Sequence, residues 1–224
     1  MSCCSVSNTG KVFTESAGYC AWKFRHRGLD GAQRMLARAL RNLGLASRSI
    51  LEIGCGVGGL HLTLLRDGAA SAIGIEVSEG MVGKAREIAM EMGLQAKTAY
   101  HVGDFAVADG TIPRSDIVIL DKVLCCYSDP EALLRKSAEK CNRLLAVSYP
   151  GDRWIPRWMF KSYELAGRIF RWSFYPFYHE PSRLDAAARS HGFDRVFSGN
   201  TIIWQVMVYE KRGGKGKSRV GSKE

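Results

Sequence analysis

The chain has 224 residues, 46% of them hydrophobic and 24% charged, with a formal net charge of +10. This length and composition suit one globular domain with a full core and argue against a second independent domain. No apolar run approaches the ~20 residues of a membrane span, the N-terminus lacks a secretory signal, and the seven cysteines show no C-x-x-C spacing, so we expect a cytoplasmic protein with reduced thiols.

The N-terminal two thirds alternate between strand-like and helix-like segments. Residues 1–29 lack periodicity and are predicted to form a flexible N-terminal cover segment, with Phe13, Tyr19 and Trp22 packed on a bound ligand. Apolar spacing then predicts helices over 30–44, 59–67, 80–92 and 130–140, and strands near 49–53, 71–77, 97–102, 116–120 and 143–148. Ser78 is the expected N-cap of the third helix, and Asp129-Pro130 begins the fourth.

The C-terminal third adds a helix near 182–191 and strands near 193–198 and 202–209, joined as a hairpin through Ser198-Gly-Asn200. The alternation predicts an α/β fold: a Rossmann-like, seven-stranded, mostly parallel sheet with helices on both faces and a C-terminal antiparallel hairpin. This domain is expected over 30–210. Residues 211–224 hold six basic residues and one acidic residue, a charge of +5, and are predicted to form a disordered basic tail.

A glycine-rich turn over 54–59 directly follows the first predicted strand, and a second apolar run ends in Glu76. Strand, glycine turn, helix, strand and carboxylate form the layout of a nucleoside-binding unit. Gly54, Gly56 and Gly59 also fit G-x-G-x-x-G, so an NAD-dependent dehydrogenase is the alternative. Glu52 argues against it, because a carboxylate beside a pyrophosphate is unfavourable but beside an ammonium and a sulfonium is favourable.

These motifs resemble those of class I S-adenosylmethionine-dependent methyltransferases, of a small-molecule type. Residues 52–58 resemble the E/D-x-G-x-G-x-G motif, 73–82 the second motif, 103–105 the third and 116–121 the fourth strand. The resemblance covers about 30–150 and implies S-adenosyl-L-methionine as cofactor. By resemblance, the turn and Glu52 hold the methionine part, Glu76 the ribose, and Asp104 with Phe105 the adenine. The implied cofactor residues are Glu52, Gly54, Cys55, Gly56, Gly58, Glu76, Val77, Met81, Gly103, Asp104, Phe105, Asp121, Lys122 and Val123.

An insertion at about 151–181 interrupts the alternation, and residues 154–178 hold ten of the 22 aromatic residues, interleaved with basic ones. Three interpretations stay open: a lid over a flat or apolar acceptor, an interfacial helix on an anionic membrane, or packing on the sheet or a second subunit. The pattern also suits single-stranded nucleic acid, but no nucleic-acid module is present. Predicted substrate contacts are Tyr127, Asp152, Arg153, Trp154, Trp158 and Tyr178.

Tyr127 and His179 are the candidate catalytic residues. Tyr127 follows the fourth strand, where it would face the methyl group, and His179 closes the insertion with a side chain suited to base chemistry. A packed tyrosine and a satisfied histidine are the structural alternatives. No H-x-E or H-E-x-x-H pattern occurs, so we expect no catalytic metal.

The sequence therefore predicts a methyltransferase that transfers a methyl group to a small, aromatic or lipophilic acceptor by in-line displacement. The alternatives are the dehydrogenase, or a non-catalytic cofactor-binding or peripheral membrane protein that uses the insertion and tail as contacts. The sequence leaves the oligomeric state open.

Overall fold

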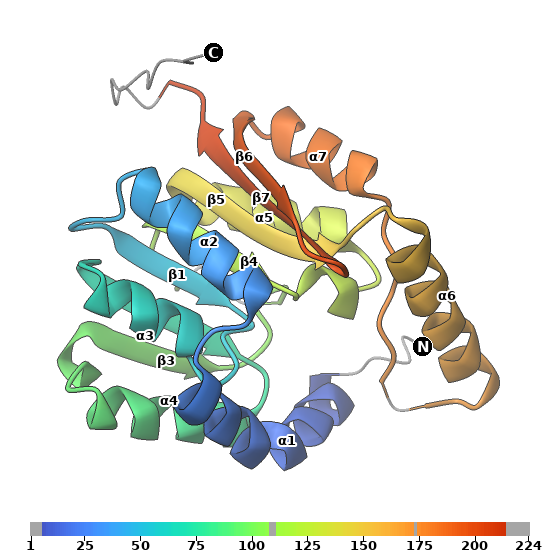
Figure 1. Cartoon of the computed structure of the whole chain (residues 1–224), viewed down its shortest axis with the longest axis horizontal. Coiled ribbons are helices and arrows are strands. Elements are labelled where there is room, and N and C mark those ends of the chain that lie inside the picture. Colours follow the sequence, from blue (N-terminus) through green and yellow to red (C-terminus); the bar gives the residue numbers. More distant parts are fainter. Residues whose placement is uncertain (1–5, 108–110, 173, 214–224) are drawn as a thin grey trace.

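The structure, a computed structural model, describes residues 6–107, 111–172 and 174–213. Its centre is a seven-stranded sheet of order β3-β2-β1-β4-β5-β7-β6 (Figure 1). The strands are β1 Ser49–Ile53, β2 Ser71–Glu76, β3 Thr98–Val102, β4 Ser115–Asp121, β5 Cys141–Pro150, β6 Phe193–Asn200 and β7 Trp204–Lys211. The first five are parallel, and β7 pairs antiparallel with both β5 and β6. The predicted fold class is confirmed.

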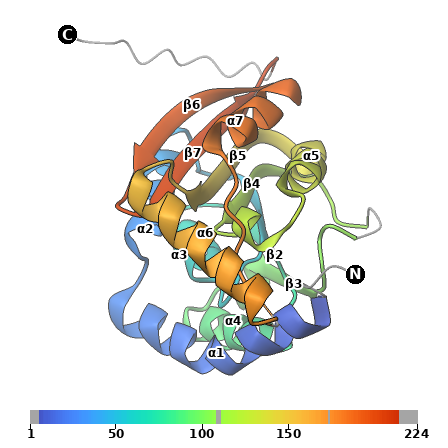
Figure 2. The same ribbon diagram turned by 90° about the vertical axis from the view of Figure 1, so that its right-hand side faces the viewer.

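Seven α-helices are described along with two short 3-10 turns, Gln95–Lys97 and Leu124–Cys126. The helices are α1 Val6–Arg27, α2 Gly31–Asn42, α3 Gly59–Arg66, α4 Glu79–Glu91, α5 Pro130–Lys140, α6 Trp154–Ile169 and α7 Pro181–Ser190. Side-chain N-caps fix three of their starts: Asp30 for α2, Ser78 for α4 and Asp129 for α5. Figure 2, which looks at the right-hand side of Figure 1, shows α6 lying across this side of the molecule with α1 below it.

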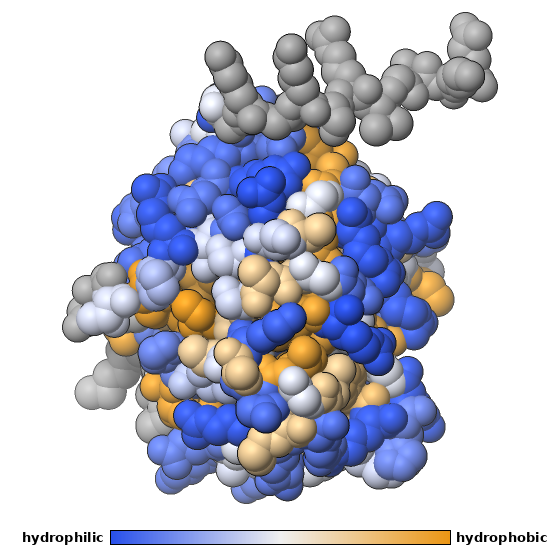
Figure 3. All heavy atoms as spheres, turned by 90° about the vertical axis from the view of Figure 1, so that its left-hand side faces the viewer, coloured by the Kyte–Doolittle hydropathy of each residue, from blue (hydrophilic) through white to orange (hydrophobic). Residues whose placement is uncertain are grey.

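The surface opposite α6 is mixed in character. Seen from the left of Figure 1, hydrophilic residues cover most of this side, with hydrophobic ones between them (Figure 3). Within residues 6–107, 111–172 and 174–213, no helix has both the length and the apolar character needed to pass through a bilayer.

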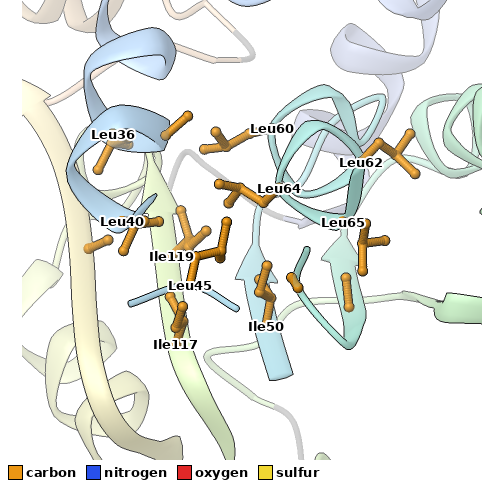
Figure 4. Packing of buried hydrophobic residues seen from close by; sticks show 14 of the residues in the cluster. Leu36, Leu40, Leu45, Ile50, Leu60, Leu62, Leu64, Leu65, Ile117 and Ile119 are labelled. Atoms are coloured by element: carbon orange, nitrogen blue, oxygen red, sulfur yellow. The ribbon is translucent and has the colours of Figure 1, made fainter. Parts of the chain in front are cut away.

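The core has two layers because alternate residues of each strand point to opposite faces of the sheet. Ile117 and Ile119 of β4 face α2 and α3, whereas Val118 and Leu120 face α5 and α7. On the first face, leucines of α2 and α3 meet strand isoleucines, among them Ile50 (Figure 4). The sheet is therefore covered on both sides, which leaves the ends of its strands as the place for a ligand site.

The N-terminal segment differs from the prediction, because α1 is a continuous helix rather than an aperiodic cover. Its buried positions are small residues, Gly10, Ala17 and Ala21, at helical spacing. Small residues give no hydrophobic signal of the kind that large apolar side chains give, which is why the helix was not predicted. Across the interface with α4 and its N-cap, the Arg25 guanidinium pairs with Glu91 at 2.6 Å.

The hairpin turn also lies later than predicted. β6 continues through Asn200, and the turn is closed by Thr201, whose N–H donates to the Trp204 carbonyl oxygen at 2.8 Å. Gly199, predicted to form the turn, lies within β6, where a Cβ would be 2.3 Å from the Met35 sulfur. This glycine allows α2 to approach the strand closely rather than allowing the chain to reverse.

Candidate functional site

Two adjoining cavities lie at the carboxyl ends of the parallel strands. The larger, of about 460 Å³, is lined by the segments after β1, β2, β3 and β4 and by α1. The smaller, of about 240 Å³, shares Gly54, Gly56 and Lys122 with it and adds Glu52 and Cys55. Together they form one elongated site across the middle of the sheet edge.

The glycine turn after β1 forms the floor of this site. Gly54 has a φ of +66°, and a Cβ there would be 2.4 Å from a Val123 methyl group, so only glycine fits without a shift. Its N–H donates to the Ile75 carbonyl oxygen at 2.7 Å, which ties the turn to the end of β2. At Gly56, also a cavity-lining residue, a Cβ would meet no atom within 4 Å. A ligand can therefore lie directly on the backbone at that point.

Glu76, at the end of β2, is held by two backbone donors. Its Oε2 accepts the Gly56 N–H at 2.9 Å and its Oε1 accepts the Ser78 N–H at 3.1 Å. Burial raises the pKa of this carboxyl above its ordinary value, although the backbone N–H groups oppose the effect. Each oxygen retains acceptor capacity. The fixed carboxylate is thus suited to accept from a pair of neighbouring hydroxyls such as those of a ribose.

Asp104 lines the larger cavity together with the turn. Its Oδ1 accepts the Ala106 N–H at 2.8 Å and the Tyr127 hydroxyl at 2.5 Å. Within the described part of the chain, Oδ2 has no hydrogen-bond partner, and Phe105 beside it is buried. The arrangement leaves one oxygen to accept from an exocyclic amine such as that of adenine, next to an aromatic side chain.

The Tyr127 hydroxyl is a donor in this arrangement. Burial, together with the bond to the Asp104 carboxylate, raises the pKa of Tyr127 far above its ordinary value. The phenol therefore keeps its proton, and its geometry favours positioning Asp104 over acting as a general base.

A charged cluster lines the smaller cavity. Gln33 Nε2 donates to Asp121 Oδ2 at 3.0 Å, and the Ser148 hydroxyl donates to Asp121 Oδ1. Lys122 has a φ of +60°, uncommon for a residue with a side chain, and its Nζ binds Asp30 and lies 3.6 Å from Asp121. Although burial acts in the other direction, Lys122 and backbone donors hold the pKa of Asp30 below its ordinary value. The cluster presents fixed carboxylates to a cationic group.

Glu52 is more deeply placed than the resemblance implied. The residue is 2% exposed, and its Oε2 lies 2.6 Å from Nδ1 of His61, which is 0% exposed. Nε2 of His61 lies 2.9 Å from the Tyr100 hydroxyl oxygen. Burial raises the pKa of Glu52 above its ordinary value, and the His61 contact opposes the rise. Glu52 thus lines the smaller cavity while its carboxylate is held from behind by α3.

The structure brings nearly all predicted cofactor residues together. All of them except Gly58 line one of the two cavities. Gly58 is instead the N-cap of α3, with a φ of +78°. Among His, Cys, Asp and Glu of the described residues, no group of three or more is arranged to hold a metal ion.

Of the predicted substrate and catalytic residues, only Tyr127 lines the larger cavity. Arg153, Trp154 and Trp158 begin the exposed helix α6, and Asp152 accepts the Tyr178 hydroxyl at 2.8 Å on the surface. His179 and Tyr178 line a separate cavity of about 630 Å³. Nε2 of His179 lies 2.8 Å from the Tyr127 carbonyl oxygen, and burial lowers the pKa of its imidazole. The structure therefore does not place His179 as a base at the larger cavity.

Three cavity residues that sequence reasoning did not single out as a group come from α1: Phe13, Ser16 and Cys20. Their spacing by three and four residues is the helical signal that would have found them. Phe13 also packs edge-on against Phe174, with ring centroids 5.3 Å apart. Tyr19 and Trp22, expected on the ligand, are exposed and stack on each other instead.

Comparison with known proteins identifies the central part of the chain. Residues 50–146 match the sequence model of a family described as a methyltransferase domain. Over residues 50–146 the chain is therefore similar to methyltransferase domains. This match agrees with the predicted resemblance and favours it over the dehydrogenase alternative.

Two curated relatives are methyltransferases of small molecules by name. The chain is 34% identical over 101 residues to a ubiquinone biosynthesis O-methyltransferase of Methylococcus capsulatus, which covers 45% of this chain and 40% of the relative. It is 30% identical over 129 residues to a norajmaline N-methyltransferase of Rauvolfia serpentina, covering 54% and 41%. The chain thus spans about two fifths of the length of these relatives.

Solved structures share the fold of the methyltransferase domain and its surroundings. A magnesium protoporphyrin IX methyltransferase from Synechocystis PCC 6803 with bound SAH (S-adenosylhomocysteine) superposes with a TM-score of 0.72 at 20% identity, covering 92% of this chain and all 100% of that one. The [4+2]-cyclase SpnF superposes with a TM-score of 0.68 at 15% identity, covering 91% and 94%. The same fold thus occurs in a protein named for a different reaction, so function must be argued from the site.

Proposed function

We propose that the protein is an S-adenosylmethionine-dependent methyltransferase that acts on a small-molecule acceptor. The observation that carries the proposal is the pair of carboxylates around the open glycine turn. Glu76 is fixed by two backbone donors, and Asp104 has one oxygen fixed and the other unpartnered, in the same cavity. Together with the methyltransferase domain match, this arrangement supports an adenosine-containing cofactor.

The residues fit S-adenosylmethionine along the whole site. Glu76 would accept from the ribose hydroxyls, Oδ2 of Asp104 from the adenine amine, and Phe105 would pack on the base. The smaller cavity, with Glu52, Asp30 and Asp121, would receive the methionine part and its ammonium group. When bound, the cofactor supplies an electrophilic methyl group attached to a sulfonium.

The chain's own contribution to the reaction is positioning and exclusion of water. Aligning the acceptor with the methyl carbon contributes on the order of 7–11 kcal/mol in favourable cases. Phe13, Ile53 and Val123 add an apolar lining to the larger cavity that can hold an acceptor against the cofactor and keep water away. Because Tyr127 retains its proton, we assign it the positioning of Asp104.

The acceptor is proposed to be a small molecule with an apolar body. The relatives named above are an O-methyltransferase of ubiquinone biosynthesis and a norajmaline N-methyltransferase, and the structural neighbour is a magnesium protoporphyrin IX methyltransferase. The apolar lining of the larger cavity supports the same class. The cytoplasmic location and the boundaries of the cover, domain and tail segments stay predictions.

Calorimetric titration with S-adenosylmethionine and S-adenosylhomocysteine tests the cofactor assignment. We expect micromolar binding to wild type and at least about tenfold weaker binding to Glu76→Ala, because charge-assisted hydrogen bonds are lost. Glu79→Ala, which removes an exposed carboxylate three residues away, is the matched control and should bind like wild type. A folded protein that binds neither ligand but binds NADH would overturn the proposal. Release of S-adenosylhomocysteine with a panel of quinols, alkaloids and porphyrins then identifies the acceptor.

A further inference from the structure

Helix α6 carries a row of large apolar side chains that face away from the fold. At 3.6 residues per turn their positions fall within a sector of roughly 60°, and they are 61–73% exposed. This apolar stripe consists of Trp154, Trp158, Leu165 and Ile169. The opposite side of the helix is the one that packs: Phe160 meets Trp204 with ring centroids 5.8 Å apart, and Gly167 lies against Tyr175. Exposed apolar rows of this kind mark interaction surfaces.

The same segment is strongly basic. Residues 153–172 contain five basic residues and one acidic residue, a net charge of +4. Arg157, Lys161 and Arg168 follow one flank of the apolar stripe at helical spacing. Arg168 pairs with the lone acid, Glu164, at 2.7 Å, whereas Arg157 makes no ion pair within the described residues. Cationic groups beside exposed tryptophans are the arrangement that suits an interface between anionic headgroups and acyl chains.

The position of α6 relates this surface to the site. The helix follows β5 and stands on the side of the molecule toward which the parallel strands point (Figures 1 and 2). The segment after α6 contacts α1 through Phe174 and Phe13, and Phe13 lines the larger cavity. A surface bound to α6 would therefore lie next to the wall of that cavity.

We propose that α6 docks this protein on an anionic lipid bilayer. The apolar stripe lies among the outer acyl chains, and Arg157 and Lys161 contact the headgroup phosphates. Charge favours this occupant over a second copy of the chain, because pairing two α6 helices would bring two segments of charge +4 together, whereas an anionic bilayer neutralises them. Resting on the proposed function, docking implies a lipophilic acceptor that enters the cavity from the bilayer.

Co-sedimentation of the full chain with vesicles tests the docking. The protein should bind vesicles containing phosphatidylglycerol, less so at high salt, and bind pure phosphatidylcholine vesicles weakly. Trp158→Ser and Ile169→Ser should each weaken binding by about tenfold or more, since each removes a buried apolar anchor. Met90→Ser is the matched control, because Met90 is 60% exposed in the last turn of α4, before β3 begins, whereas α6 lies on the side toward which the parallel strands point. This variant should bind like wild type.

Variants of charged residues and removal of the tail form the second part of the vesicle experiment. Arg157→Glu should weaken binding to the anionic vesicles, whereas Arg135→Glu, at an exposed position of α5, should not. A chain ending at Gly213 removes most of the basic tail. If that chain loses binding while the α6 variants keep it, docking through α6 is wrong. Vesicle-independent dimerisation that Trp158→Ser abolishes would likewise overturn it in favour of a second copy.

Titration with S-adenosylhomocysteine keeps the two proposals apart. Every α6 variant should bind this ligand like wild type, since the apolar stripe does not line either cofactor cavity. Intact ligand binding without vesicle binding rejects the docking alone. A wild type that fails to bind the ligand rejects the proposed function, and the vesicle result then still decides the docking.

Discussion

Replacing His61 by phenylalanine would remove the donor to a carboxylate that has almost no contact with water. Glu52 and His61 are 2% and 0% exposed, and their contact of 2.6 Å is supplemented by the His61 N–H at 3.3 Å. Leaving a buried ionised carboxylate without its hydrogen-bond partner costs about 3 kcal/mol or more. Phenylalanine keeps a ring of similar size, so most of the expected loss comes from the carboxylate and not from an empty space.

Protonation sets an upper limit to this loss. Taking up a proton at neutral pH costs an ordinary glutamate about 3.5 kcal/mol, and about 1.4 kcal/mol less for each unit of pH toward acid. We therefore expect His61→Phe to lower the free energy of unfolding by about 3 kcal/mol at pH 7 and by about 1 kcal/mol at pH 5. The sign follows from linkage, because burial raises the pKa of Glu52 in the folded protein above its pKa in the unfolded chain. The folded variant is therefore most stable at a pH below the pKa of Glu52 in the unfolded chain. It loses stability as the pH rises toward the pKa of Glu52 in the folded state.

Urea unfolding followed by circular dichroism at both pH values measures the effect. Tyr100→Phe serves as the control, because it leaves the Glu52–His61 contact in place. It removes a hydroxyl that lies 2.9 Å from Nε2 of His61 and donates to the Ala85 carbonyl oxygen at 3.4 Å, and it should cost about 1 kcal/mol. The double variant Glu52→Gln/His61→Phe should lose clearly less than the sum of the two single variants. A loss below about 1 kcal/mol for His61→Phe, or an equal loss at both pH values, would refute the reasoning.

Three further outcomes follow from the site geometry. Tyr127→Phe removes the donor to Asp104 and should weaken S-adenosylhomocysteine binding by about two- to twelvefold. The kcat at saturating cofactor should stay within about twofold of wild type. A loss of kcat by about a hundredfold would make Tyr127 catalytic. Affinity for S-adenosylhomocysteine should fall as the pH drops through the raised pKa of Glu76, because the ionised carboxylate is the acceptor. In a calorimetric pH series, the affinity of Glu76→Gln should change less with pH than that of wild type. The same pH dependence in both proteins would contradict the role of Glu76 as acceptor. Gly54→Ala places a Cβ 2.4 Å from a valine methyl at a φ of +66° and should lower Tm and ligand affinity together, at a cost of about 1–3 kcal/mol. Gly83→Ala, inside α4 with open space around it, should leave ligand affinity unchanged and keep or raise Tm; a Gly54→Ala variant with the wild-type Tm would show that the turn relaxes.

The cofactor half could be predicted from the sequence because its signals are local. Strand β1 and the turn after it are contiguous, and the ends of parallel strands meet at one edge of a sheet. Glu76 is the last residue of β2 and Asp104 lies two residues after β3, so their convergence needed only the fold class. The pairing of Glu52 with His61 needed the structure, because it depends on how the first turn of α3 packs beneath β1.

The acceptor half of the site was harder to predict from the sequence, for a physical reason. The contact face of α1 consists of small residues, which pack closely but carry no periodic hydrophobic signal. In the insertion, aromatic content predicted importance but not direction: Phe160 and Tyr175 are buried, whereas Trp154 and Trp158 face outward. The amino-acid composition does not tell whether an aromatic side chain covers a site or faces away from it. Only the way in which α6 packs on the fold shows the direction of each side chain.

The acceptor side of the site lies outside the matched residues, which explains why the methyltransferase domain match does not name an acceptor. The matched residues, 50–146, contain the glycine turn and both cofactor carboxylates, whereas Phe13 and Phe174 lie outside them on either side of the chain. A neighbour with the same fold is named for a cyclisation, which is consistent with the reaction being set by the walls added to a common sheet. Exchanging Phe174, which is not part of the lining of either cofactor cavity, should therefore change which acceptor is methylated while leaving S-adenosylhomocysteine affinity unchanged. Exchanging Phe13 of α1, which lines the larger cavity, should change both.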